Sequence, residues 1–129
     1  MAIPTVTALY GALNAGLNIA LAAQVVRHRG RTGTSIGDGS SKELALAVRI
    51  HANNAEFMPL ALILMLLAEL CNGSAFILHI AGGVLLLSRI AHVLGMPRPA
   101  PNALRSAGVT GTWGLIIALS GWLLLLRRG

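Results

Sequence analysis

Long apolar stretches separated by short polar segments make up most of the chain. They cover residues 5–26, 45–70, 75–94 and 107–126. A helix needs about 20 residues to cross the roughly 30 Å hydrocarbon layer of a membrane. The stretches are rich in Leu and Ala and lack the alternation of apolar and polar positions that marks half-buried strands. The pattern therefore predicts an all-α membrane protein, with residues 1–129 forming a single domain that is a bundle of four transmembrane helices.

The composition supports a membrane protein. The chain is 55% hydrophobic and only 11% charged, whereas about a quarter of the residues of a soluble domain are charged. The net charge of +6 could indicate a nucleic-acid partner. However, the basic residues lie at the ends of the predicted helices, as in membrane proteins, so no nucleic acid is expected to bind. The single Cys71 excludes an intrachain disulfide and a cysteine metal cluster, and no metal site is expected.

The connections between the predicted helices set the orientation. Residues 28–41 form a polar loop, residues 71–74 a tight turn, and residues 95–104 a segment whose prolines disfavour helix. The first and third connections lie on the same side of the membrane. They and their flanks carry most of the basic residues, namely Arg27, Arg29, Arg31, Lys42, Arg98 and Arg105. Only Arg127 and Arg128 follow the last helix. The positive-inside rule therefore predicts that loops one and three are cytoplasmic and that both termini are outside. The first helix, which lacks a basic segment before it, is expected to be retained rather than cleaved.

Polar residues interrupt the second apolar stretch near its beginning. Because a helix turns by about 100° per residue, Arg49, Asn53 and Glu56 fall within about 60° of one another and form one stripe. His51 points to another face. The same rotation places Arg89 of the third helix in a stripe with His92 and Met96, and Arg105 of the fourth in a stripe with Gly108 and Thr112.

These charges are expected to lie near one depth. At about 1.5 Å per residue, Arg49 reaches the cytoplasmic interface and Glu56 lies about 10 Å deeper, near the level of Arg89. Arg29 ends the first helix and Arg105 begins the fourth on the same side. Four arginines from four helices therefore gather with one carboxylate.

Two interpretations of this cluster follow. Glu56 and Arg89 could form a structural ion pair, with Arg29 and Arg105 as interfacial anchors. However, a charge within a span costs at least about 2.5–3.5 kcal/mol and usually faces a partner or water. Since one carboxylate neutralises one arginine, the excess of positive charge favours an anionic ligand, with Glu56 free to meet an ammonium group.

The polar cluster contains a motif that resembles a known family. Its positions are Arg49, His51, Asn53, Glu56 and Pro59 in the second helix, Arg89 and His92 in the third, and Arg105 and Ser106 at the start of the fourth. This pattern resembles the membrane-associated proteins in eicosanoid and glutathione metabolism, the MAPEG family, in its short bacterial form. The resemblance extends over the whole chain. It implies a homotrimer in the bacterial inner membrane, with sites between neighbouring subunits near the cytoplasmic side and glutathione as the co-substrate.

The resemblance also implies roles for individual residues. The positions that look like glutathione contacts are Arg29, Arg49, His51, Asn53, Glu56, Arg89 and His92. Arg105 looks like the arginine that stabilises the glutathione thiolate, and Ser106 like the serine that follows it in one branch of the family. Either Arg27 or Arg29 resembles the arginine lent by the adjacent subunit. Glutathione has two carboxylates and one ammonium, so several arginines and one glutamate complement its charges.

The function that follows is a glutathione transferase, with or without peroxidase activity, that acts on a small lipophilic electrophile entering from membrane lipid. One departure from the family favours an alternative. Several relatives have a tyrosine where this chain has Met96, and the one tyrosine, Tyr10, lies in the outer part of the first helix. The alternative is a non-catalytic binding protein for glutathione or a lipid ligand. A small four-helix multidrug transporter is a third interpretation, but such transporters depend on a glutamate in the first helix, which here has no acidic residue.

Overall fold

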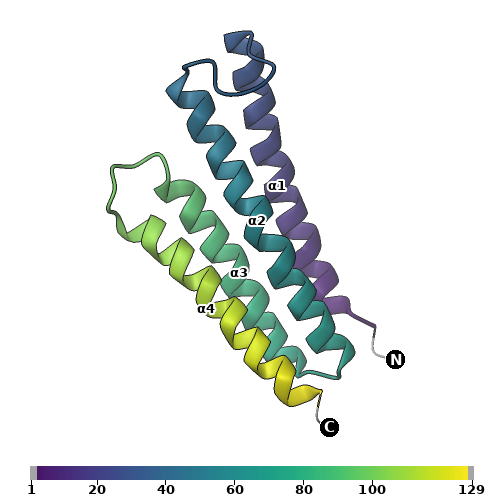
Figure 1. The fold of residues 1–129 in the computed structure, drawn as a ribbon. Helices are drawn as coiled ribbons and strands as arrows, with labels where there is room; N and C mark the ends of the chain where they lie inside the picture. The colour runs from purple at the N-terminus through teal and green to yellow at the C-terminus, as the bar shows by residue number, and fades with distance from the viewer. Residues whose placement is uncertain (1–2, 128–129) are drawn as a thin grey trace.

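The computed structural model describes residues 3–127, so Arg128, which entered the topology argument, lies outside the described residues. Its elements are α1 (Thr5–Thr32), α2 (Lys42–Leu70), α3 (Ala75–Gly95) and α4 (Ala103–Leu126) (Figure 1). Each helix is long and apolar enough to cross a membrane. No strand occurs within residues 3–127. The predicted all-α, four-helix architecture is confirmed.

Every helix is longer than its apolar stretch, α1 and α4 by the most. Helix α1 continues to Thr32 and ends where Gly33 adopts a left-handed conformation with φ of 64°. Helix α4 begins at Ala103 rather than at residue 107. The predicted loops were therefore wrong for residues 28–32 and for residues 95, 103 and 104, which are helical. Hydropathy marks where the apolar stretch ends, whereas backbone hydrogen bonding in α1 continues through the polar residues beyond it.

Side-chain caps fix the starts of α2 and α4. The hydroxyl of Ser41 accepts a hydrogen bond from the backbone N–H of Leu44 at 3.2 Å. The carboxamide oxygen of Asn102 accepts one from the N–H of Arg105 at 2.9 Å. Each cap satisfies a backbone donor that has no partner within its helix. As a result, Arg105 is held in the first turn of α4.

The helices lie side by side, with the α1–α2 and α3–α4 loops at one end and the α2–α3 turn at the other (Figure 1). This arrangement agrees with the prediction that the first and third connections share a side. Helix α1 packs on α2, and α4 packs on α3. The buried apolar core lies toward the end with the α2–α3 turn and comprises Val6, Ala61, Met65, Ala68, Leu78, Ala81, Leu85 and Leu119. The polar residues of interest lie toward the other end.

Two glycines allow close packing within one chain. A Cβ at Gly108 would lie 2.6 Å from the Cβ of His92, so the absence of a side chain lets α3 and α4 approach closely at that position. Gly82 likewise faces the ring of Tyr10. Tyr10 thus lies near Gly82, about 10 Å along α3 from Arg89 at 1.5 Å per residue. It is in the half of the bundle away from the polar cluster, as expected.

A buried carboxylate that the hydropathy pattern did not reveal ties α2 to α1. Glu69 is 7% exposed and accepts hydrogen bonds from the backbone N–H groups of Val6 at 2.9 Å and Thr7 at 2.7 Å. These donors belong to the first turn of α1, where N–H groups have no partner within the helix and the helix dipole favours a negative charge. Glu69 therefore caps α1 from a neighbouring helix.

Candidate functional site

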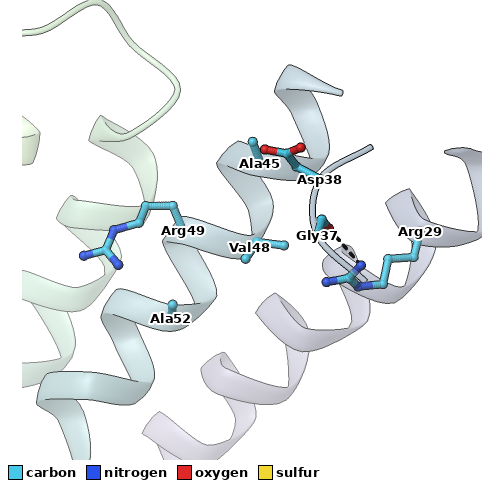
Figure 2. A pocket seen from close by; sticks show the side chains of 7 residues that line it. All are labelled: Arg29, Gly37, Asp38, Ala45, Val48, Arg49 and Ala52. Atoms are coloured by element: carbon cyan, nitrogen blue, oxygen red, sulfur yellow. Dashed lines mark hydrogen bonds between the residues drawn. The ribbon is translucent and has the colours of Figure 1, made fainter. Parts of the chain in front are cut away.

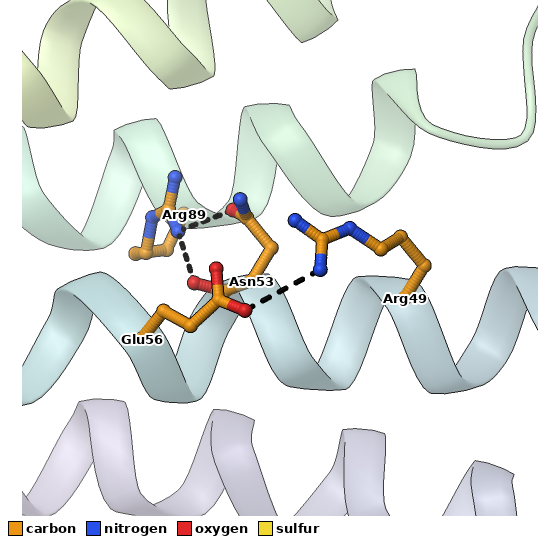
Figure 3. Close-up of polar contacts among 4 residues, drawn as sticks. All are labelled: Arg49, Asn53, Glu56 and Arg89. Atoms are coloured by element: carbon orange, nitrogen blue, oxygen red, sulfur yellow. Dashed lines mark hydrogen bonds and ion pairs between the residues drawn. The ribbon is translucent and has the colours of Figure 1, made fainter.

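The stripe on α2 is the centre of the polar cluster. Arg49 Nη1 lies 3.3 Å from Glu56 Oε1, and the two side chains are 58% and 49% exposed (Figure 3). Asn53 lies between them on the same face. The ion pair of Glu56 is with Arg49, and none between Glu56 and Arg89 is found within residues 3–127. The interpretation of Glu56 and Arg89 as a structural pair was therefore wrong.

Arg89 is buried where α2, α3 and α4 meet. It is 1% exposed, and its Nη1 donates to Asn53 Oδ1 at 3.0 Å and to the Asn53 carbonyl oxygen at 3.4 Å. Its Nη2 donates to the carbonyl oxygen of Gly108 at 3.4 Å. All of these acceptors are neutral, and the Nε atom has no partner among the described residues. The positive charge of Arg89 is thus hydrogen-bonded but not neutralised.

His92 lies one turn from Arg89 on α3 and is 3% exposed. Its backbone and Cβ lie against Gly108 of α4. The positive charges of Arg89, Arg105 and Arg49 are all close enough to act on its imidazole. The structure therefore brings together the predicted residues of α2, α3 and the start of α4. The charges of three arginines thus act on one buried ring, and such an excess of positive charge attracts an anion.

Arg105 and Ser106 are exposed at the start of α4. They line a groove of about 350 Å³ together with Ala100, Pro101, Asn102, Val109 and Thr110. The hydroxyl of Thr110 donates to the Ser106 carbonyl oxygen at 2.8 Å. No hydrogen bond from the Arg105 side chain is found within residues 3–127. Its guanidinium is therefore available to a ligand.

Arg29 lies on the other side of α2 from Arg105. Its Nη1 donates to the carbonyl oxygens of Thr34 at 3.3 Å and Gly37 at 3.0 Å, which orders the loop after α1. Arg29 and Arg49 line a groove of about 330 Å³ between α1, α2 and this loop, with Gly37, Asp38, Ala45, Val48 and Ala52 (Figure 2). This groove shares no lining residue with the groove of Arg105. Within one chain, Arg29 and Arg105 are therefore not brought to one pocket.

Three further residues lie outside the polar cluster, two of them predicted from the sequence and one not. Arg27 is exposed and lines a different cavity, with Ala20, Ala23 and Gln24. His51 is half-buried, on a face about 200° from Arg49 by helical rotation, and its side chain makes no hydrogen bond within residues 3–127. Asp38 faces the groove of Arg29 and was not predicted (Figure 2). Asp38 belongs to the glycine-rich loop after α1, and the folded chain places this loop beside α2. Its position in the groove therefore could not be predicted from helical spacing.

The sequence comparison decides the family. The model of the MAPEG family matches residues 7–125, which include most of all four helices. The chain belongs to the MAPEG family. The predicted resemblance is confirmed, and it removes the interpretation as a small multidrug transporter.

Curated relatives extend this MAPEG assignment. The chain is 37% identical over 114 residues to "Inner membrane protein YecN" of Escherichia coli strain K12, a match that covers 88% of this chain and 86% of the relative. The protein of the same name from Escherichia coli O6:H1 strain CFT073 matches with the same identity and coverage. No solved structure matches significantly. Family membership and the four apolar helices together identify a multi-pass membrane protein.

Proposed function

We propose that this chain is a membrane-embedded glutathione transferase, which binds glutathione, ionises its thiol and presents the thiolate to a lipophilic electrophile. The proposal rests chiefly on one observation. Arg89 is buried with only neutral hydrogen-bond acceptors within residues 3–127, and its charge and those of Arg49 and Arg105 all act on the neighbouring buried ring of His92. Such an excess of positive charge inside a membrane protein calls for an anion.

Glutathione complements this cluster. Its two carboxylates match the guanidinium groups, since charge-assisted hydrogen bonds between arginine and carboxylate are strong and directional. Glu56 is half exposed and offers a carboxylate to the ammonium group of the ligand. On binding, the ammonium would compete with Arg49 for Glu56 and release Arg49 to a ligand carboxylate. Both partners of the Arg49–Glu56 ion pair therefore take part in recognition.

The chemical step assigned to Arg105 is stabilisation of the thiolate. A thiol has a pKa of about 8.5, taking cysteine as the reference, and a nearby fixed cation favours the ionised form. The S–H bond breaks, the proton passes to water, and the thiolate attacks the electrophile. With an aryl halide, a C–S bond forms and the halide leaves. With a hydroperoxide, the thiolate would attack the O–O bond, releasing the alcohol and forming a sulfenic acid, which a second glutathione would convert to the disulfide and water. Ser106 lies beside Arg105 and offers a hydroxyl to the reacting sulfur.

We further propose that the site is completed by a second copy of the chain. The Arg49–Glu56 pair and Arg105 are exposed on the sides of a single chain. Charged groups at this depth need shelter from lipid. A homotrimer in the bacterial inner membrane, with loops one and three in the cytoplasm and both termini outside, would provide it. Arg29 of a neighbouring copy would then reach the ligand, and the electrophile would enter from the surrounding lipid.

A non-catalytic binding protein for glutathione or a lipid ligand is the second candidate. It is favoured by Met96, which supplies no acidic hydroxyl to the thiol, and by the position of Tyr10 in the opposite half of the bundle. Both candidates predict a ligand at the arginine cluster, but only the transferase predicts turnover.

Turnover of a generic aryl halide with glutathione by the purified protein separates the two candidates. The transferase should form the thioether and release halide faster than glutathione alone. Arg127→Ala, at the opposite end of α4, is the matched control and should retain the rate. Binding of glutathione without any rate above the uncatalysed reaction would leave the binding protein as the function. Absence of both glutathione binding and turnover would remove the transferase and the glutathione-binding protein, and would leave only the binding protein for a lipid ligand.

A further inference from the structure

Arg89 is poorly placed to touch a ligand. Its side chain is among the largest fully buried ones and is 1% exposed. Its guanidinium bridges Asn53 of α2 and Gly108 of α4. A ligand that approached it from outside would have to break these hydrogen bonds and separate the helices. Its effect on a ligand therefore has to pass through a neighbour.

The neighbour is Asn53, and the chemistry of the contact fixes the orientation of its side chain. A guanidinium only donates hydrogen bonds, and of the two ends of a carboxamide only the oxygen accepts. The Asn53 oxygen therefore faces Arg89, at 3.0 Å from Nη1, because the reverse orientation would set donor against donor. The NH₂ group is consequently turned away from Arg89, as Figure 3 shows.

This NH₂ group is not fully buried, and Asn53 as a whole is half-buried. The NH₂ group makes no hydrogen bond within residues 3–127, and it is not among the buried side-chain atoms of that range that lack a partner. Arg49 stands one turn away on the same face of α2 and directs its guanidinium to the same side (Figure 3). Two sets of donors thus lie side by side at the surface of α2.

We infer that Arg89 is a positioning residue, which holds the carboxamide of Asn53 so that its NH₂ group, together with Arg49, donates to a carboxylate of the ligand. This inference rests on the proposed function, since the carboxylate is one of the two in glutathione. It deepens that function by separating a residue that contacts the ligand from one that orients the contact.

A double-mutant cycle on glutathione affinity tests the inference. Arg89→Lys keeps the charge but lacks the planar group that bridges Asn53 and Gly108, so Asn53 loses its fixed orientation. We expect affinity to fall about tenfold in the wild-type background, in line with a lost hydrogen bond to a charged group. In the Asn53→Ala background, Arg89→Lys should change glutathione affinity by less than about twofold, because the carboxamide that Arg89 orients is absent. An equal loss in both backgrounds would overturn the inference, since Arg89 would then touch the ligand itself.

Asn53→Asp gives a second test that does not disturb Arg89. The aspartate keeps an oxygen toward Arg89 and replaces the NH₂ group by an acceptor. The thermal midpoint should be retained while glutathione affinity is lost. Retained affinity would show that the NH₂ group does not serve the ligand.

A third measurement does not depend on glutathione binding. The side-chain amide resonance of Asn53 in ¹⁵N-labelled protein, assigned by its absence in Asn53→Asp, is followed while acetate is added. A shift in the wild type that disappears in Arg89→Lys supports the inference even if glutathione proves not to bind, in which case only the proposed function fails. An unmoved resonance in the wild type would overturn the inference.

Discussion

Arg49 and Glu56 form an ion pair seven residues apart on one face of α2, at 3.3 Å, although each side chain is about half exposed. Exposed ion pairs of this kind contribute about 1 kcal/mol or less to stability. The pair is thus weak enough to be opened by a ligand that offers both an ammonium and a carboxylate. Buried Arg89, by contrast, has Asn53 as its partner. We therefore expect Glu56 to be dispensable for folding but needed for recognition of the proposed ligand.

Glu56→Gln should lower glutathione affinity by roughly tenfold or more, because a hydrogen bond between charged groups contributes about 1.5–3 kcal/mol. The thermal midpoint should change little. Calorimetric titration and thermal unfolding of the same sample measure the two effects. Glu43→Gln, an exposed change in the first turn of α2, is the control and should leave affinity unchanged. Normal affinity with a lowered midpoint would assign Glu56 a structural role instead.

A change at Glu69 should lower stability and leave glutathione affinity unchanged, the reverse of a change at Glu56. Glu69→Gln keeps one carbonyl oxygen but cannot accept from both Val6 and Thr7 as the carboxylate does. Leaving one buried N–H without its partner costs about 1–3 kcal/mol. Denaturant or thermal unfolding in detergent should therefore show a clear loss of stability. Glutathione affinity should be unchanged, because Glu69 lies at the other end of α2. Wild-type stability in this variant would exclude a capping role.

Gly108 and Gly114 form a matched pair on α4. A Cβ at Gly108 would lie 2.6 Å from the Cβ of His92, whereas a Cβ at Gly114 meets no atom within 4 Å. Gly108→Ala should destabilise the chain by about 1–3 kcal/mol, the usual cost of overpacking. Gly114→Ala should be neutral or stabilising by up to about 1 kcal/mol, because alanine favours helix. Thermal unfolding of both variants checks the difference. Equal midpoints would mean that α3 and α4 pack less closely at Gly108 than described.

A homotrimer is predicted because Arg105 and the Arg49–Glu56 pair are exposed on the sides of a single chain. If two neighbouring copies complete the assembly, the mass of the protein in nanodiscs, after subtraction of lipid and scaffold protein, should be three times the 13.4 kDa of one chain. Mass photometry or native mass spectrometry gives this value directly. A stable monomer that still binds glutathione would rule out a site between subunits.

Hydropathy and spacing predicted much of this protein, and the failures have physical causes. The four helices and the α2 stripe follow from apolar length and a rotation of about 100° per residue, which depend on local sequence alone. The burial of Arg89 and its bond to Asn53 depend on how closely α3 and α4 approach, and three glycines between these helices, Gly95, Gly108 and Gly111, allow that distance. The structural ion pair of Glu56 with Arg89, which was the alternative to an anionic ligand, was wrong because this packing gives Arg89 the carboxamide of Asn53 instead.

The residues that were missed lie where chain segments distant in sequence meet. Glu69 sits at the end of an apolar stretch, and only the docking of α1 reveals that it caps that helix. Asp38 belongs to a loop whose course depends on two hydrogen bonds from Arg29. Neither contact leaves a periodic pattern in the sequence. A carboxylate followed closely by a turn, at the end of an otherwise apolar helix, was the one available signal for Glu69.

The central claim is that the arginine cluster ionises glutathione through Arg105, and the ultraviolet absorbance of the thiolate during a glutathione titration tests it most directly. The wild type should show thiolate at neutral pH, and S-methylglutathione, which has no thiol, should give no signal. Arg105→Ala should keep most of the affinity but lose the thiolate signal, since each unit of thiol pKa corresponds to about 1.4 kcal/mol. Arg105→Lys, which keeps the charge but not the planar fork, should fall between them. An undiminished thiolate signal in Arg105→Ala would contradict the claim and transfer the role to another cation, with Arg29 of a neighbouring copy the next to test.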